Sequence, residues 1–294
     1  MKKCVFTGSG VAIITPFTED GVDYDKLGEL IDFQINEGTD AIIICGTTGE
    51  SSTMTDDEHI LVIEYCVKRV KGRLPVIAGT GSNDTKYAVN LSKQAQDVGA
   101  DSILTVSPYY NKTTQRGLYE HFKAIAQAID IPVILYNVPS RTNLNINPET
   151  IKKLSEIENI VGIKECNLNQ VGEIINLCGP DFTVYSGEDG LVVPLMSLGG
   201  KGVISVMANL IPNDTHKLSA GMLSGDLENS RLLQLKALDL VKALFIEVSP
   251  VPIKEAMNLM GFNVGKCRMP LVDMAEENKK TLIKAMKDYG LKLI

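Results

Sequence analysis

The stretch PVILYNVPSRTNLNINPETIKKLSEIENIVGIKE, residues 132–165, contains one full copy of the pattern that decides the fold. Its ends, 132–137 and 160–164, are short runs rich in Val and Ile, which is typical of strands. Between them a helical pattern opens at Pro148-Glu149, where proline is tolerated in a first turn. The apolar residues of each run are consecutive rather than alternating, as expected for strands that are covered on both faces. The stretch therefore predicts a β-α unit of a parallel sheet.

The same unit recurs along the chain. We expect eight strands, at 10–16, 41–46, 75–79, 102–107, 132–137, 160–164, 183–186 and 202–206. One of the intervening helices should begin at Thr55, whose hydroxyl and the acidic residues after it meet the unpaired amides of a first turn. Eight units predict an α/β protein with a (β/α)8 TIM barrel. The alternative, a doubly wound open sheet, usually has fewer strands and no comparable ring of functional residues at every strand end.

Chain length and the last quarter of the sequence predict the domain organisation. The 294 residues exceed the roughly 250 of a typical barrel. Helical periodicity continues from about residue 212 to 289, which is more than one closing helix requires. We therefore expect a catalytic barrel at 1–225 and a C-terminal helical extension at 226–294.

Composition excludes several classes of function. A formal net charge of -7 and the lack of a Lys/Arg stripe argue against a nucleic-acid partner. No apolar run has membrane-spanning length and the N-terminus lacks the apolar region of a signal peptide, so we expect no membrane association and a cytoplasmic location. The six cysteines and three histidines are scattered without metal-ligand spacing, and nucleotide-binding motifs are missing. We expect no metal and no disulfide.

Polar residues follow the ends of several expected strands, where the active site of a barrel lies. Lys164 is the decisive one, because residues 160–163 should carry it into the upper layer of the barrel. Burial there disfavours the ammonium and exposes a nucleophilic amine, the property that Schiff-base chemistry requires. The alternative is a lysine that extends into solvent at the start of a loop.

Neighbouring strand ends supply partners for such an amine. Tyr136 can move protons if hydrogen bonds position its phenol, and Thr47 and Tyr110 can extend a relay to bulk water. The amides and hydroxyls around Thr47-Thr48 suit a carboxylate, as does the guanidinium of Arg141. Taken singly, each is equally well explained as a core, turn or surface residue.

Taken together, these residues resemble a known family, the pyruvate-dependent class I aldolases of the dihydrodipicolinate synthase and N-acetylneuraminate lyase type. The resemblance covers nearly the whole chain and rests on several motifs in the family's order: 8–10 with 15–17, 46–50, 108–111, 136–142, 162–165 and 202–205. Thr47-Thr48 and the string from Tyr136 to Thr142 are similar to the dihydrodipicolinate synthase branch. The sialic acid lyase branch tends to have Ser-Thr and lacks the arginine.

The resemblance implies a function for each residue. Lys164 would form a Schiff base with pyruvate, whose carboxylate Thr47 and Thr48 would hold. Tyr136, Thr47 and Tyr110 would relay protons, with Tyr110 contributed across a dimer interface. The remaining substrate-binding residues would be Arg141, which receives the carboxylate of aspartate semialdehyde, together with Gly187 and Ile204. The family also implies a homo-oligomer, either a dimer or a tetramer, that synthesises 4-hydroxy-tetrahydrodipicolinate for diaminopimelate and lysine formation without a cofactor.

Two departures from the family pattern affect these expectations. Asn143 stands where the family usually has glycine, and asparagine tolerates left-handed backbone angles, so the turn should survive. Lysine-inhibited members are similar to this chain at Ser51, His59, Asn83 and Tyr109. They carry histidine at the position of Asp56 and glutamate at that of Tyr87, so we expect weak or absent inhibition by lysine.

Two other functions stay open at the level of sequence. A sialic acid or 2-keto-3-deoxy sugar acid lyase would use the same amine with another acceptor. A catalytically inactive barrel kept as a binding subunit is the second, and it should have lost Lys164 or Tyr136, both of which are present.

Overall fold

Eight parallel strands close into a barrel in the computed structural model, which describes residue 2 and residues 4–294. The strands follow one another around the barrel in chain order, and β1 pairs with β10 to close it. Their bounds are β1 Gly8–Ala12, β4 Ala41–Ile44, β5 Val76–Gly79, β6 Ser102–Val106, β7 Val133–Asn137, β8 Ile160–Glu165, β9 Thr183–Ser186 and β10 Gly202–Ser205. The (β/α)8 architecture predicted from the sequence is confirmed.

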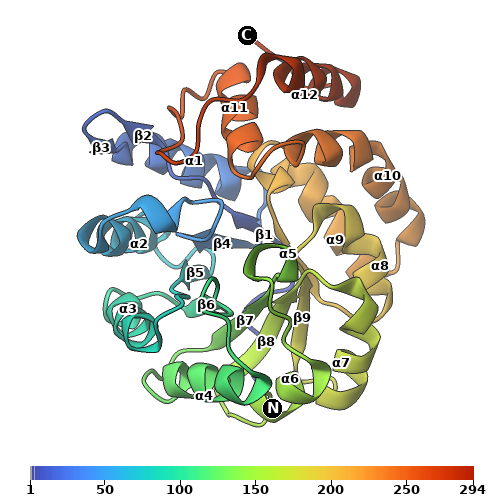
Figure 1. Ribbon diagram of the computed structural model, residues 1–294. Helices are drawn as coiled ribbons and strands as arrows, with labels where there is room; N and C mark the ends of the chain where they lie inside the picture. The colour runs from blue at the N-terminus through green and yellow to red at the C-terminus, as the bar shows by residue number, and fades with distance from the viewer. Residues whose placement is uncertain (1, 3) are drawn as a thin grey trace.

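Helices surround the strands and a group of C-terminal helices covers one side of the ring (Figure 1). The ring helices are α1 Tyr24–Asn36, α2 Asp56–Val70, α3 Thr85–Asp97, α4 Gln115–Ala126, α6 Pro148–Leu154, α7 Val171–Cys178, α8 Val192–Ser197 and α9 Pro212–Ser224. The short α5, Pro139–Thr142, lies in front of the barrel opening. The C-terminal helices are α10 Leu227–Leu244, α11 Val251–Leu259 and α12 Glu276–Tyr289. In the part of the chain that the structure describes, no helix has the length and apolar character to span a bilayer.

Consecutive apolar residues of a strand enter two different cores. In β4, Ile43 belongs to the cluster that fills the barrel, whereas Ile42 and Ile44 belong to the larger cluster between strands and helices. Each strand therefore buries both faces, which explains why its sequence does not alternate. The larger cluster also includes Leu240 of α10 and Val264, so the C-terminal segment shares the core of the barrel.

The structure corrects two sequence expectations. The first strand is Gly8–Ala12 rather than 10–16, because residues after Ala12 turn to other partners: the amide of Ile14 donates to the side chain of Asn209. The C-terminal segment is not helical throughout 212–289, because 261–275 is irregular. Gly261 and Gly265 have φ of 89° and 75°, and a Cβ on Gly265 would lie 2.0 Å from the carbonyl oxygen of Phe17. The hairpin of β2 Phe17–Thr18 and β3 Gly21–Val22 was not foreseen.

The expected helix starts at Thr55 and Pro148 are confirmed. Thr55 is the N-cap of α2, where its hydroxyl accepts from the amide of Glu58 at 3.2 Å and the Glu58 carboxylate accepts from the amide of Thr55 at 3.0 Å. Pro148 is the first residue of α6. A capping box therefore marks the start of α2, whereas the start of α6 has proline in its first turn and no side-chain cap.

Candidate active site

An irregularity in β8 aims Lys164 into the barrel. Ile160 pairs with Val133, but Gly162 pairs with Ile134, so Val161 is an extra residue opposite β7. Ile160 and Ile163, three positions apart, consequently both face the outer core, while Val161 faces the inner one. Since side chains alternate along a regular strand, an uninterrupted β8 would turn Lys164 outward. Because of the bulge, Lys164 pairs with the inward-facing Tyr136.

Lys164 is buried, with 6% of its surface exposed, and its Nζ lies 4.4 Å from the centroid of the Tyr136 ring. Burial lowers the pKa of the Lys164 amine, although Cys166, Asp189 and Glu188 act in the opposite direction. Gly187 lies against it: a Cβ there would approach the Cε of Lys164 to 3.2 Å and the Sγ of Cys166 to 2.3 Å. The glycine therefore leaves the amine room to react.

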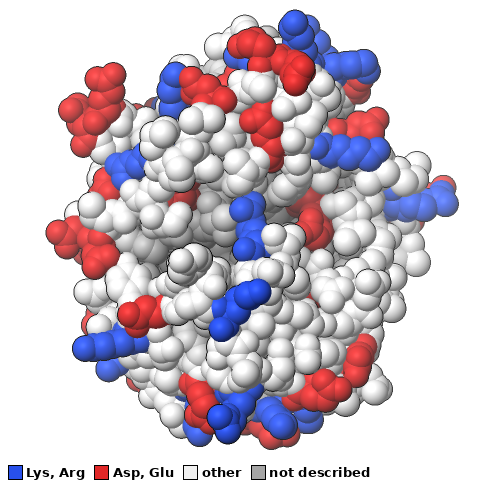
Figure 2. Space-filling view, viewed as in Figure 1, with Lys and Arg blue, Asp and Glu red and all other residues white. Residues whose placement is uncertain are grey.

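The amine opens into a cavity of about 860 Å³ at the carboxyl ends of the strands. The face of the molecule that carries the barrel opening is hollowed at its centre, with blue Lys and Arg side chains beside the hollow (Figure 2). Nine of the site residues expected from the sequence line the cavity: Thr47, Thr48, Ser51, His59, Tyr109, Tyr136, Arg141, Lys164 and Gly187. The volume accommodates a small keto acid together with a second small substrate.

The loop after β4 presents the two threonines. Thr48 is buried and Thr47 is exposed to the cavity. The loop is bracketed by Cys45 and Glu50, both at φ 55°, a left-handed conformation that is unfavourable for residues other than glycine. The Thr15 hydroxyl donates to the Gly49 carbonyl at 2.8 Å, and the Glu50 amide donates to the Thr47 carbonyl at 3.1 Å. These contacts hold a strained turn whose hydroxyls and amides suit a carboxylate.

The opposite wall is formed by Arg141 of α5. Its exposed guanidinium donates from Nη2 to the Ser249 carbonyl at 3.5 Å, so α5 touches the segment that precedes α11. Asn143 ends α5 at φ 49°, the left-handed conformation expected of a residue in place of glycine. The turn is therefore retained despite the substitution.

Glu165, next to Lys164 in sequence, faces the other side of β8. Its carboxylate accepts from Asn137 Nδ2 at 2.8 Å, from the Asn167 amide at 2.7 Å and from Gln170 Nε2 at 2.9 Å. Burial nevertheless raises its pKa to about 7, because these donors only partly offset the loss of water. Glu165 thus ties the end of β8 to β7 and to the following turn without a cationic partner among these contacts.

The model of the Dihydrodipicolinate synthetase family matches residues 5–289 of the chain. The chain belongs to this family. It is 70% identical over 291 residues to the 4-hydroxy-tetrahydrodipicolinate synthase of Acetivibrio thermocellus, covering 99% of this chain and 100% of that one. The enzyme of the same name from Caldicellulosiruptor bescii is 59% identical, covering 98% of each chain. The dihydrodipicolinate synthase of Aquifex aeolicus superposes with a TM-score of 0.96 at 51% identity, covering 98% of this chain and 99% of that one.

In this member of the dihydrodipicolinate synthetase family, three of the expected residues lie away from the cavity lining. Tyr110 is 93% exposed and has φ of 67°, and it is not part of the cavity lining. Ile204 is 1% exposed in the inner core. The carbonyl of Asn83 accepts from Asn111 Nδ2 at 3.0 Å. One chain alone therefore does not assemble the three-hydroxyl relay, and a role for Tyr110 depends on a second copy.

Some cavity residues of this family member were missed by the sequence analysis. Glu188 lines the cavity near Lys164, and burial raises its pKa. Phe245, Val248 and Ser249 of the C-terminal segment also line it. Glu188 had a detectable signal, since it lies two residues after β9, where barrel active sites recruit residues. The C-terminal residues had none, because their place depends on how the extension folds back.

Proposed function

We propose that Lys164 forms a Schiff base with pyruvate and that the chain condenses this pyruvate with L-aspartate 4-semialdehyde. The product is 4-hydroxy-tetrahydrodipicolinate, a precursor in diaminopimelate and lysine biosynthesis, and the enzyme is a lyase of the class I aldolase type. The observation that carries the proposal is the buried amine of Lys164, which has a lowered pKa, an open cavity and a neighbouring phenol.

The first half of the reaction needs a neutral amine and a proton carrier. The amine adds to the ketone carbon of pyruvate, and the carbinolamine loses water to give an iminium. We assign the proton transfers of these steps to Tyr136, whose ring centroid lies 4.4 Å from Nζ. Burial raises the pKa of Tyr136 far above its ordinary value, so the phenol is neutral and available as a donor. Thr47 and Thr48 would hold the carboxylate through hydroxyls and amides.

In the second half the iminium acts as an electron sink. Loss of a methyl proton gives an enamine, whose carbon attacks the aldehyde, and the aldehyde oxygen takes up a proton to become the 4-hydroxyl. The amine of the acceptor then attacks the iminium carbon, closes the ring and releases Lys164. One water leaves for each pair of substrates joined. Arg141, on the opposite wall from the threonines, would bind the carboxylate of the aldehyde.

We further propose that the functional unit is at least a dimer, in which Tyr110 of one protomer completes the relay of the other. Two observations on Tyr110 support this proposal: its side chain is 93% exposed, and its backbone is left-handed. Strained backbone conformations of this kind cluster at functional sites. A homotetramer, a boundary between barrel and extension at residues 225 and 226, and a cytoplasmic location are part of the same proposal. The proposed boundary falls between α9 and α10.

Borohydride reduction in the presence of pyruvate, followed by peptide mass mapping, tests the Schiff base. We expect one added three-carbon acid, on the peptide that contains Lys164, and none in Lys164→Ala. A label on any other lysine would overturn the assignment. A coupled assay with aspartate semialdehyde, run beside N-acetylmannosamine and glyceraldehyde as acceptors, then tests the second substrate, and preference for a sugar would exclude the synthase reaction.

A further inference from the structure

We propose that the buried ion pair of Glu50 and Lys254 is a positioning device, through which the C-terminal segment holds the Thr47-Thr48 loop in its binding conformation. The inference rests on the proposed function, because it assumes that this loop binds the carboxylate of pyruvate. Glu50 and Lys254 would not touch the substrate. They would act through the loop.

The loop requires an outside support. Its two flanking residues, Cys45 and Glu50, both adopt left-handed backbone conformations that cost about 1 kcal/mol or more for residues other than glycine. Such conformations persist only where the surroundings determine them. At Cys45 the support is the barrel, since this residue follows β4 and belongs to the outer core. At Glu50 the surroundings include the C-terminal segment.

The carboxylate of Glu50 has two partners from that segment. Lys254 Nζ lies 2.7 Å from Oε1, and the Arg268 amide donates to Oε2 at 2.8 Å. Both charged side chains are almost fully buried, with 2% and 1% of their surfaces exposed. Lys254 also donates to the Lys266 carbonyl at 2.9 Å and lies 4.4 Å from the centroid of the Phe17 ring. Each partner of Glu50 is thus fixed by further contacts.

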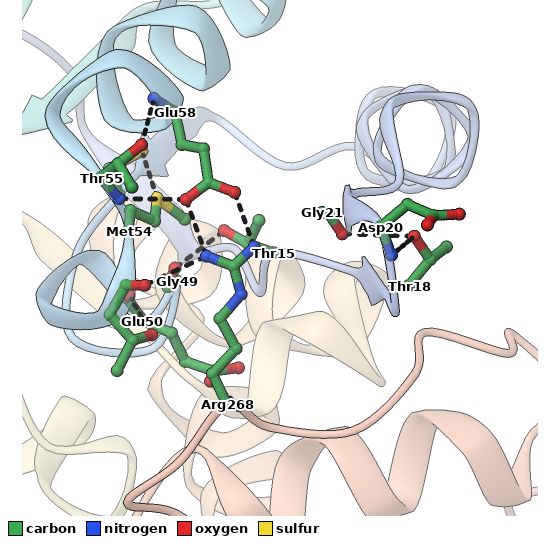
Figure 3. A network of polar contacts seen from close by, with 12 residues as sticks. Thr15, Thr18, Asp20, Gly21, Gly49, Glu50, Met54, Thr55, Glu58 and Arg268 are labelled. Carbon is green, nitrogen blue, oxygen red and sulfur yellow. Dashed lines mark hydrogen bonds and ion pairs between the residues drawn. The ribbon is translucent and has the colours of Figure 1, made fainter.

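A second contact secures the same loop a few residues on. Figure 3 shows Arg268 reaching between the loop of Glu50 and the start of α2. Its guanidinium binds both oxygens of Glu58, at 2.8 Å and 2.6 Å, and donates to the Thr53 carbonyl at 3.0 Å. Arg268 of the irregular stretch 261–275 therefore contacts both the end of the loop and the start of α2.

A buried pair of opposite charges is a poor source of stability, because removing both from water costs about as much as their attraction returns. Apolar residues of similar size would hold two segments together at least as well. The charged pair adds a requirement of position, since Oε2 accepts from the Arg268 amide while Oε1 lies beside the Lys254 ammonium in an ion pair without hydrogen-bond geometry. The geometry thus points to control of loop conformation rather than to added stability.

The position of Lys254 connects both sides of the cavity. Lys254 is in the first turn of α11, and the residue two before this helix is Ser249, whose carbonyl accepts from Arg141. Helix α11 therefore contacts the threonine loop through Glu50, and the residues that lead into the helix contact α5 through Ser249. Displacement of α11 would alter both walls, but loss of the Glu50 contact alone should affect the pyruvate side.

The test compares Lys254→Met, Glu50→Gln and the double variant with the wild type. Pyruvate half-saturation is measured in two ways, by steady-state KM and by the concentration dependence of borohydride trapping, and thermal unfolding is followed in parallel. Each single variant leaves one buried charge unpaired and should lower the Tm. The double variant should recover most of this Tm yet keep a pyruvate half-saturation raised about 10-fold, while the KM for aspartate semialdehyde changes by less than about 3-fold.

A purely structural role predicts the opposite, namely that the double variant recovers pyruvate half-saturation together with the Tm. That result overturns the proposal. Should the variants with an unpaired charge not fold, Glu50→Asp replaces them, because it keeps the charge but shortens the side chain. The proposal expects a raised pyruvate half-saturation in this variant, and an unchanged value overturns it. Lys266→Met removes a lysine of the same segment whose partner Asp273 is exposed, and it should change nothing. Failure of the wild type to trap pyruvate would instead contradict the proposed function.

Discussion

Two buried lysines of this chain have similar surroundings and different partners. Lys164 in the barrel and Lys254 in α11 are 6% and 2% exposed, and each Nζ lies 4.4 Å from the centroid of an aromatic ring. Burial lowers the pKa of both. Lys254, however, has a carboxylate at 2.7 Å and a carbonyl at 2.9 Å, whereas Lys164 has no ion pair or hydrogen bond within the described part of the chain.

The difference teaches that burial alone does not make a lysine reactive. An amine that is paired with a carboxylate keeps its proton and its lone pair stays occupied, so it serves the structure. An amine that is buried beside an open cavity without such a partner loses its proton more easily and can attack a carbonyl. The barrel thus keeps the unpaired amine of Lys164 at the proposed active site, although its burial is destabilising. In the extension, the buried ammonium of Lys254 is paired with a carboxylate.

Lys164→Met should give the largest effect and is the strongest test of the difference between the two lysines. Activity should fall by at least about 10³-fold, because the nucleophile is lost. The free energy of unfolding should rise by about 1 kcal/mol, because a buried amine without a charged partner is replaced by an apolar chain. The same change at Lys254 should lower the free energy of unfolding by about 3 kcal/mol. Denaturant unfolding and a coupled assay measure both, and equal stability changes at the two sites would refute the comparison.

Glu165 extends the comparison to acids, since it is a buried carboxylate whose hydrogen-bond donors are neutral. Its native pKa of about 7 lies above the ordinary 4.5, so the unfolded chain loses the proton first as the pH rises. The native state then binds more protons between these values, and stability falls with rising pH by up to about 3 kcal/mol across that window. Glu165→Gln should remove this slope.

The measurement is denaturant unfolding of wild type and Glu165→Gln at several pH values from 4.5 to 7.5. Glu156→Gln, a change on an exposed carboxylate that lies 3.5 Å from Lys152, is the matched control and should keep the slope of the wild type. A variant whose stability depends on pH as steeply as the wild type would show that Glu165 is ionised throughout.

Part of this organisation was predictable from the sequence. Eight apolar runs with helical segments between them identify the barrel, and polar residues at their carboxyl ends identify Lys164, Tyr136 and Thr47 as neighbours. The inward direction of Lys164 was expected, but for an incomplete reason. It depends on the bulge at Val161, and a one-residue irregularity leaves no periodic signal in a run that is apolar on both faces.

The partners of the C-terminal segment were not predictable. Lys254 lies in a helical pattern and Glu50 in a turn, about two hundred residues apart in sequence, so nothing local relates them. Their contact depends on the irregular stretch 261–275, where left-handed residues and Pro270 end the helical pattern. Long-range pairing of this kind appears only once the fold is known, although the break in the helix was visible in the Gly and Pro residues.

Arg141 lies between the two regions, because it lines the cavity of Lys164 and touches the segment that leads to Lys254. Arg141→Ala should reduce kcat/KM for aspartate semialdehyde by about 30-fold, the value of one charge-assisted contact at an exposed site. The pyruvate half-saturation and the Tm should stay close to those of the wild type. An equal loss for both substrates would mean that Arg141 acts on α11 rather than on the acceptor.

Inhibition by free L-lysine is the smallest effect that we expect. Its binding would place an amine in a third environment, besides those of Lys164 and Lys254. Ser51, His59, Tyr109 and Tyr87 line the cavity, but the Tyr87 hydroxyl donates to Asp56 at 2.6 Å. Burial, and then this hydrogen bond, raises the pKa of Tyr87 to about 12, so the phenol is neutral at pH 7 and supplies no charge to an ammonium.

The carboxylate of Asp56 already accepts from Tyr87, so an incoming lysine would have to displace this phenol to form an ion pair like that of Lys254. We therefore expect an inhibition constant for L-lysine above about 1 mM in initial-rate assays. A submillimolar constant would show that an ammonium can be held here by neutral groups alone, and the role given to charged partners in separating Lys164 from Lys254 would then need revision.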